Sequence, residues 1–208
     1  MVFLNRGDHF TARPLPPEAQ WSPAFGVAAA DFDGDGFEDV VLAQNFSGSQ
    51  PETDRDDAGL GLFLRGDGKG GLVAWSPMES GLSIPGEQRA VAVADFDQDG
   101  RSDLVLTQNR ELTQILRNEG GKRGLRVRIR GDSNTPSGIG SQLRLVFQAT
   151  RMGPVQEIRA GSGYLSQDSP VIVMATPEVP IGVWIRRPGK APRIQTLEPG
   201  ATEVMIDP

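Results

Sequence analysis

The chain has 208 residues, enough for one large or two small domains. Its 26 glycines and 16 prolines, with no window of sustained helical periodicity, favour short strands and turns, so we expect an all-β fold. The absence of cysteine excludes a thiol nucleophile, a zinc–thiolate site and a disulfide framework. The net charge of −6 divides unevenly, because residues 1–120 carry 20 acidic and 9 basic side chains and residues 121–208 carry 7 and 12. This asymmetry suggests two modules.

The first ten residues, MVFLNRGDHF, lack the basic region and long apolar run of a signal peptide. If the natural protein is exported, its signal lies upstream of this sequence. No stretch approaches the ~18–20 apolar residues that span a bilayer, so we expect no membrane span. The segment LNRGDHF has two later counterparts, LRGDGKGGL at residues 64–72 and LRNEGGKRGL at residues 116–125. Each follows an apolar strand and is expected to form a tight hairpin turn.

A 20-residue unit occurs twice, at residues 26–45 and 90–109, with 13 of 20 residues identical. At its centre are two acidic loops, DFDGDGFED at residues 31–39 (loop 1) and DFDQDGRSD at residues 95–103 (loop 2). Small alanines precede each loop and would let neighbouring sheets approach closely, and a continuous apolar run typical of a buried strand follows it. A repeat of about 60 residues built from short strands predicts blades of a β-propeller.

Both loops place aspartate at positions 1, 3, 5 and 9 and glycine at position 6. Carboxylates this close repel one another unless a cation lies between them, and an all-oxygen set suits Ca²⁺. Mg²⁺ fits less well because it keeps several waters in rigid octahedral geometry. The alternative is a solvated acidic turn. The predicted ligands of two Ca²⁺ ions are the side chains of Asp31, Asp33, Asp35, Asp39, Asp95, Asp97, Asp99 and Asp103 and the backbone carbonyls of Phe37 and Arg101.

These ions are expected to be structural, because no catalytic base or nucleophile stands at a recognisable spacing nearby. We therefore expect a protein that is not an enzyme. Residues 47–59 are polar and predict a long exposed loop, whose acids could instead form a further cation site. A rival hypothesis is a glycan-acting enzyme, or part of one, with a carboxylate pair among Asp54, Asp56, Asp57 and Asp67.

The pattern changes after Lys122. In residues 125–130 the apolar side chains of Leu125, Val127 and Ile129 alternate with three arginines, which we expect to face outward. Further strands are predicted at residues 143–147, 155–160, 171–175, 181–186 and 202–206, which together suggest a small sandwich or barrel. The arginines could bind an anionic polymer such as an acidic glycan. The alternatives are a solvated face or a dock for the acidic half of the chain.

The acidic unit DFDGDGFEDVVLAQN and its partner resemble FG-GAP/VCBS repeats, the calcium-loop blades of integrin-α-like propellers. The segments SGIGSQLRL, VQEIRAGSGYLSQDS and VWIRRPGK resemble the ASPIC/UnbV domain. We place the two regions at residues 1–121 and 122–208, an arrangement similar to that of the cartilage acidic protein family and its bacterial relatives. Residues 171–180 read VIVMATPEVP where the ASPIC/UnbV pattern has a Phe-Gly-Leu-Gly segment.

This resemblance implies an extracellular or periplasmic, Ca²⁺-binding adhesion module with a protein or carbohydrate ligand. Nucleic acid is not an expected partner. A closed propeller needs at least four blades and the chain encodes roughly two. We therefore expect a fragment of a longer protein, or open blade edges that pair with another copy or with the C-terminal domain.

Overall fold

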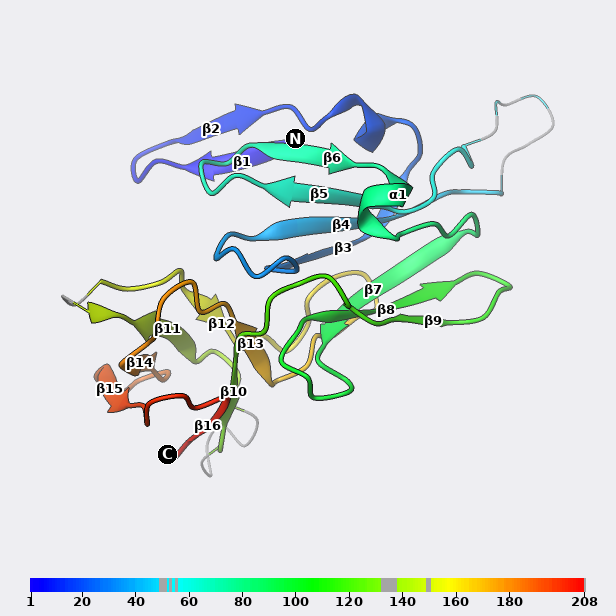
Figure 1. Ribbon diagram of the computed structural model, residues 1–208. Helices are drawn as coiled ribbons and strands as arrows, with labels where there is room; N and C mark the ends of the chain where they lie inside the picture. Colours follow the sequence, from blue (N-terminus) through cyan, green and yellow to red (C-terminus); the bar gives the residue numbers. More distant parts are fainter. Residues whose placement is uncertain (49–51, 53, 55, 132–137, 149–150, 208) are drawn as a thin grey trace.

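The computed structural model describes residues 1–207 except 49–51, 53, 55, 132–137 and 149–150 (Figure 1). The described part is all-β, as predicted, with 16 strands in five sheets. Its helical structure comprises the 3-10 turn η1 (Pro17–Gln20) and the one-turn helix α1 (Pro77–Ser80). Within the described ranges the sheets do not close into a ring or barrel.

The N-terminal half contains two antiparallel sheets with the same up-and-down strand order. The first sheet has four strands: β3 (Ala24–Ala30), β4 (Asp39–Gln44), β5 (Leu62–Gly66) and β6 (Leu72–Trp75). The second has three: β7 (Gln88–Ala94), β8 (Asp103–Gln108) and β9 (Gln114–Leu116). A separate ribbon of β1 (Val2–Asn5) and β2 (Phe10–Arg13) lies beside β6 (Figure 1).

The sequence repeat is also a structural repeat. Each acidic loop joins the first two strands of its sheet, with Ala30 opposite Asp39 in one and Ala94 opposite Asp103 in the other. Two of the three predicted hairpin turns form, between β1 and β2 and between β5 and β6. The third prediction is wrong, because residues 117–124 leave β9 and cross to the C-terminal half instead of folding back.

The first strands of the two sheets, β3 and β7, pack against each other. Gly26 lies at this contact, and a Cβ atom there would approach the carbonyl oxygen of Arg89 to 2.9 Å. The small residues that precede loop 1 therefore allow two sheets to meet, as the sequence predicted. One apolar core joins the sheets, formed by Ala28, Phe32, Val41, Ala43, Phe63, Leu82, Ile84, Val91, Leu104 and Leu106.

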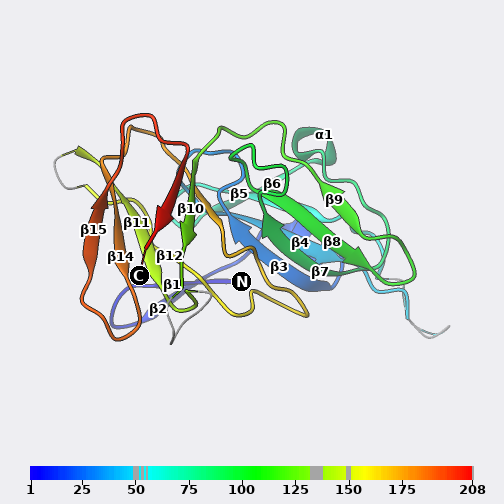
Figure 2. The ribbon, with the colours of Figure 1, turned by 90° about the horizontal axis from the view of Figure 1, so that it is seen from below.

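The C-terminal half has two sheets around one core (Figure 2). One sheet has the order β13 (Ile172–Met174), β10 (Leu125–Ile129) and β16 (Glu203–Ile206), with β10 and β16 parallel. The other has the order β12 (Gln156–Glu157), β11 (Gln142–Val146), β14 (Gly182–Arg186) and β15 (Arg193–Thr196). Both contribute to the core, which includes Leu125, Val127, Leu143, Leu145, Val183, Ile185 and Ile206.

The C-terminal half also covers part of the N-terminal half. Val93 on β7 accepts a hydrogen bond from Ser169 N at 2.8 Å, and its own N–H donates to Asp168 Oδ1 at 2.8 Å. A Cβ on Gly163 would lie 3.3 Å from the carbonyl oxygen of Val27 on β3. Segment 163–169 thus contacts the first strand of each N-terminal sheet, β3 at Val27 and β7 at Val93.

Gly26→Ala tests the close approach of β3 and β7. The repeat has alanine at the equivalent position 90, but the space at Gly26 is closed by backbone. We expect the added methyl to lower the free energy of unfolding by about 1–3 kcal/mol through overpacking. Gly120→Ala is the control, because a Cβ there meets no atom within 4 Å. Equal urea midpoints for the two variants would contradict the close packing.

Candidate metal centre

Loop 1 is wound around its own carboxylates. Asp31 accepts hydrogen bonds from the amides of Gly34 and Gly36, both at 2.7 Å, and Asp33 accepts one from Asp35 N at 3.0 Å. Gly34 and Gly36 have φ values of +73° and +96°, in the left-handed region that glycine tolerates best. In loop 2, Asp95 likewise accepts hydrogen bonds from two loop amides, those of Asp99 and Gly100. Gly100 has a φ of +85°, and Gln98, at the position of Gly34, has a φ of +62°.

The aspartate at position 9 fastens each loop to its sheet. Asp39 accepts from Phe32 N at 3.1 Å and from Gly66 N at 2.9 Å. Asp103 accepts from Phe96 N at 3.1 Å and from Asn118 N at 2.7 Å. In both repeats one carboxylate thus ties the start of the loop to the third strand or to the residues just after it. The structural repeat therefore extends beyond the predicted loop.

Three predicted ligands converge in each loop. One oxygen from each of Asp31, Asp33 and Asp39 (loop positions 1, 3 and 9) lies within 4.8 Å of the other two, and in loop 2 the converging oxygens belong to Asp95, Asp97 and Asp99 (positions 1, 3 and 5). These two groups could each hold a metal ion. Asp35 and Asp103 lie outside the groups. The positions of the Phe37 and Arg101 carbonyl oxygens as ligands stay predictions.

An arginine on the third strand of the first sheet, and one directly after the third strand of the second, reach the loop of their own sheet. Arg65 donates from Nε to Asp33 at 2.6 Å and from Nη2 to Asp35 at 2.6 Å. Arg117 is the equivalent residue of the second repeat, since each arginine comes directly after a leucine. It pairs with Asp97 at 2.6 Å and approaches Asp99 at 3.5 Å. Sequence reasoning missed both, although the repeated Leu-Arg in LRGDG and LRNEG carried the signal.

Loop 2 has two further arginine partners. Arg101 pairs with Asp99 within the loop, and its Nε donates to the Gly121 carbonyl at 2.5 Å. Arg126 on β10 donates from Nε to Asp95 Oδ2 at 2.6 Å and also pairs with Glu203. Arg126 is only 6% exposed.

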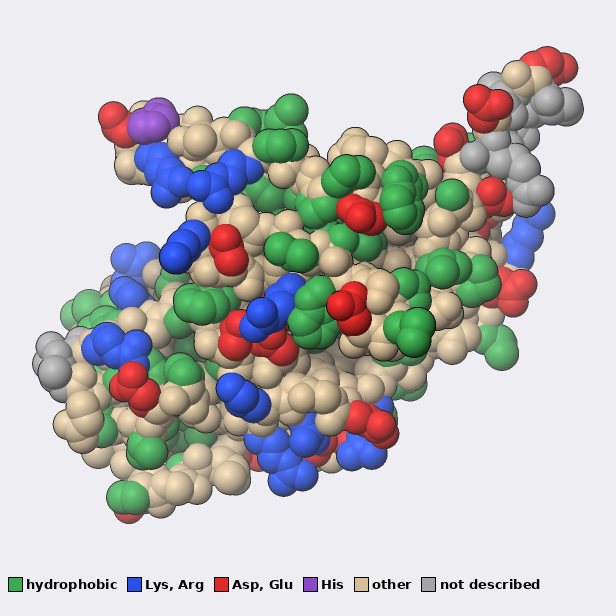
Figure 3. All heavy atoms as spheres, turned by 45° about the horizontal axis from the view of Figure 1, so that its top comes forward, with side chains coloured by type: hydrophobic (Ala, Val, Ile, Leu, Met, Phe, Trp, Pro, Cys, Tyr) green, Lys and Arg blue, Asp and Glu red, His purple; other side chains and the backbone are tan. Residues whose placement is uncertain are grey.

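The prediction that all three strand arginines face outward is therefore wrong for Arg126, which docks into the acidic half. Arg128 and Arg130 are exposed, but they approach Glu203 and Asp207 at 3.7 and 3.0 Å. On the face drawn in Figure 3, basic and acidic side chains lie next to one another over much of the surface, and acidic side chains gather at its upper right. The basis for an anionic-polymer site on this strand is correspondingly reduced.

The crossing segment 117–124 lies against both loops. Asn118 Nδ2 donates to the Phe32 carbonyl at 2.7 Å, and Lys122 N donates to the Asp33 carbonyl at 3.1 Å. Gly124 N donates to the Gly100 carbonyl at 2.8 Å. One stretch of backbone thus holds the two loops together and leads directly to Arg126.

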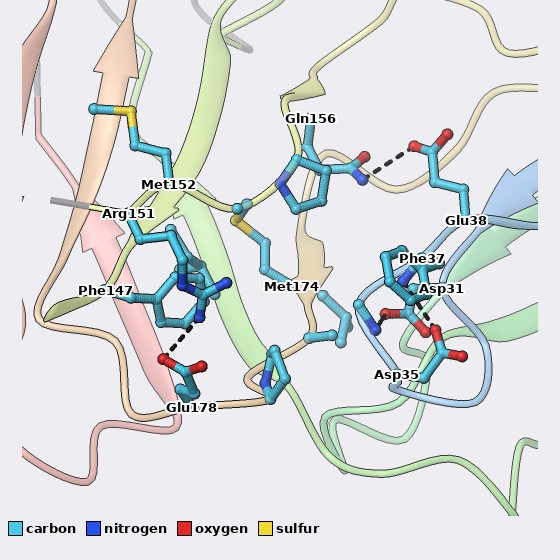
Figure 4. Close-up of a pocket in the computed structure, with 17 residues that line it drawn as sticks. Asp31, Asp35, Phe37, Glu38, Phe147, Arg151, Met152, Gln156, Met174 and Glu178 are labelled. Carbon is cyan, nitrogen blue, oxygen red and sulfur yellow. Dashed lines mark hydrogen bonds and ion pairs between the residues drawn. The ribbon is translucent and has the colours of Figure 1, made fainter. Parts of the chain in front are cut away.

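A cavity of about 370 Å³ separates loop 1 from the C-terminal half (Figure 4). Asp31, Asp35 and Phe37 lie on one side, and Phe147 and Arg151 lie on the other. Among the lining residues, Gln156 donates a hydrogen bond to Glu38 at 3.1 Å, and Arg151 forms an ion pair with Glu178 at 2.7 Å. Its volume is in the range of small-ligand pockets.

The acids of the rival enzyme hypothesis do not form one group. Asp67 lies in the β5–β6 turn, where its carboxylate accepts from Lys69 N and Gly71 N, both at 2.7 Å. Asp54, Asp56 and Asp57 lie in the β4–β5 connection, at the opposite end of β5. A carboxylate pair that includes Asp67 is therefore excluded by the hairpin topology.

Burial controls the ionisation of the buried loop carboxylates. It raises the pKa of Asp31 to about 6, although the amide hydrogen bonds from Gly36 and Gly34 oppose this, and the charges of Asp35 and Asp39 add to it. Burial also raises the pKa values of Asp39 and Asp103. A cation at the site would counter this effect by stabilising the ionised carboxylates.

The raised pKa of Asp31 predicts a pH dependence in calcium-free buffer. The folded protein binds this proton more tightly than the unfolded chain, whose reference pKa is 3.8. The stabilisation that comes from protonated Asp31 is therefore fully present below pH 3.8 and is lost as pH rises through about 6. The unfolding free energy of the unchanged chain, minus that of the Asp31→Asn variant, should fall by about 1–2 kcal/mol as pH rises from 3.8 to about 6. Paired urea titrations measure it, and a flat difference would contradict the burial effect.

Arg126→Met tests the buried ion pair. We expect it to lower the free energy of unfolding by about 3–5 kcal/mol, because Asp95 stays buried without its counter-charge. Arg128→Met, on the exposed face of the same strand, should cost less than about 1 kcal/mol. Adding Asp95→Asn to Arg126→Met should recover part of the loss in a double-mutant cycle. Additive effects in chemical denaturation would show that the pair is not coupled.

No helix in the described part of the chain is long and apolar enough to cross a membrane. Comparison with protein-family models and with curated proteins finds no match to this chain.

Proposed function

We propose that this chain is a calcium-binding, non-catalytic β module that acts outside the cytoplasm as a binding or adhesion unit. The observation that carries the proposal is the convergence of Asp31, Asp33 and Asp39 in a glycine-shaped loop that occurs twice in the chain. The donors are all oxygens, which Ca²⁺ prefers and which do not favour zinc or copper. The second group, in loop 2, is the other candidate site.

The ion would act on folding. Loop 1 joins β3 to β4, and Asp39 ties the same loop to the end of β5 through Gly66 N. A cation among these carboxylates removes their mutual repulsion and so fixes three strands at once. When bound, Ca²⁺ supplies charge neutralisation and no reaction chemistry. Asp35 and the Phe37 carbonyl are the proposed additional ligands, and waters complete the six to eight that Ca²⁺ takes.

The family proposal is an FG-GAP/VCBS-type propeller region followed by an ASPIC/UnbV-like domain. Three observations support it: the up-and-down order of both N-terminal sheets, the packing of β3 against β7, and the position of each acidic loop between the first two strands. The proposed location outside the cytoplasm follows from the same resemblance. The two sheets are then blades of an incomplete propeller, whose inner edges segment 163–169 partly covers.

The cavity beside loop 1 is the proposed ligand site. Two aromatic rings, Phe37 and Phe147, face it from opposite sides, and charged groups lie at its rim. Apolar walls with a few polar groups are typical of pockets that bind small molecules or a side chain of a partner. The partner class that we propose is a protein or a carbohydrate.

A thermal melt tests the calcium proposal. After removal of divalent ions, addition of Ca²⁺ should raise the melting temperature of the full chain, and a concentration 100 times Kd should add about 2.7 kcal/mol to stability. Asp33→Asn should remove most of this rise, because it deletes one of the three converging charges. Mg²⁺ at equal concentration is the control and should have a smaller effect. A melting temperature that does not respond to Ca²⁺ would rule out the proposal.

A further inference from the structure

The two acidic loops share one sequence pattern but differ in what neutralises them. We infer that loop 1 takes a divalent cation, whereas in loop 2 the guanidinium of Arg126 takes the place of the ion and makes the loop a joint to the C-terminal half. The inference rests on the proposed function for loop 1. It departs from the sequence-based expectation of two Ca²⁺ ions.

The charge balance of the loops is unequal. Each has four aspartates. In loop 1 one guanidinium, that of Arg65, is paired with them, which leaves a net charge of −3. In loop 2 the guanidinium groups of Arg101, Arg117 and Arg126 are paired with them, which leaves −1 among these groups, or −2 when Glu203, the second partner of Arg126, is included. The attraction for a divalent cation is correspondingly stronger in loop 1.

The difference is greatest among the oxygens that converge. In the described part of the chain, the hydrogen bonds to Asp31 and Asp39 in loop 1 come from backbone amides, and neither has a side-chain cation as partner. In loop 2 all three converging carboxylates have a guanidinium partner: Asp95 has Arg126, Asp97 has Arg117, and Asp99 has Arg101 and Arg117. Loop 1 therefore has free negative charge at its centre and loop 2 does not.

Arg126 is the partner that cannot move aside. Arg65 and Arg117 are about half exposed and can turn into solvent when an ion enters. The Arg126 side chain is buried on β10, whose backbone is fixed by a 3.0 Å bond from Arg126 N to the Thr202 carbonyl. An ion in loop 2 would place two positive charges beside a buried guanidinium, where water screens little. The parallel pairing of β10 with β16 thus holds the internal cation in place.

The consequence is a division of roles between two copies of one motif. Calcium binding in loop 1 stabilises the β3–β4–β5 hairpins, and its removal leaves the Asp95–Arg126 joint intact. The halves of the chain therefore stay connected in calcium-free conditions.

Calcium titration calorimetry on the ion-stripped full chain tests the inference. We expect one ion per chain. Asp33→Asn should abolish binding, whereas Asp97→Asn should leave the stoichiometry at one. The two variants are matched, because both residues occupy position 3 of a loop and both pair with the equivalent arginine, Arg65 or Arg117. Circular dichroism of each variant confirms that it is folded.

The outcomes separate this inference from the proposed function. Two ions per chain would overturn the inference and leave calcium binding established. One ion that is lost in Asp97→Asn and kept in Asp33→Asn would also overturn it, because the ion would then occupy loop 2. No bound ion would overturn both. One ion lost only in the loop 1 variant supports the assignment of Arg126 as the internal cation.

Discussion

Neutralising eight aspartates in two adjacent loops is the constraint on which this structure depends. The loops are wound tightly, so their carboxylates cannot separate, and several of them are buried. Part of the compensation comes from backbone amides and part from guanidinium groups that arrive from four places: the third strand of the first sheet, the residue just after the third strand of the second, loop 2 itself and β10. Arg126 of the C-terminal half therefore has a structural role in the N-terminal half.

Local backbone geometry explains why the loops can be so compact. Asp31 gathers two amides because Gly34 and Gly36 adopt left-handed conformations, and the same turn brings the next carboxylates towards a common point. Loop 2 has Gln98 in a left-handed conformation, which costs a residue with a Cβ about 1–2 kcal/mol. The network of bonds around Asp95 and Asp103 offsets that strain. Both copies keep the same winding although their partners differ.

Much of the fold follows from the sequence, because the repeat and the strand alternation are local signals. The acidic loops, the strands that flank them and most strands of the C-terminal half lie where the patterns indicate. β15 (Arg193–Thr196) was missed, because it is an exposed edge strand with Ile194 as its one large apolar side chain. For Arg126 the outward orientation was wrong, and the alternative of a dock for the acidic half is what the structure shows. Alternation places it on the polar face of β10, and only the tertiary structure shows that this face meets loop 2.

The third hairpin failed for a similar reason. LRNEGGKRGL has the glycines of a turn, but the sequence that follows pairs better with β13 and β16 than with β9. The partners of a strand depend on long-range packing that a local motif does not record. The ion pair of Asp35 with Arg65 likewise depends on a strand distant in sequence.

The hydrogen bonds of Val93 to Asp168 and Ser169 have a consequence for association with other molecules. They occupy backbone donors and acceptors on the inner strand that would otherwise be a template for an incoming peptide. A partner that binds by strand addition must then use an outer strand. β9 is the outer strand of its sheet and carries the exposed side chain of Ile115, whereas β6 lies beside the β1–β2 ribbon. Strand addition to the second sheet is therefore expected at its outer strand and not at β7.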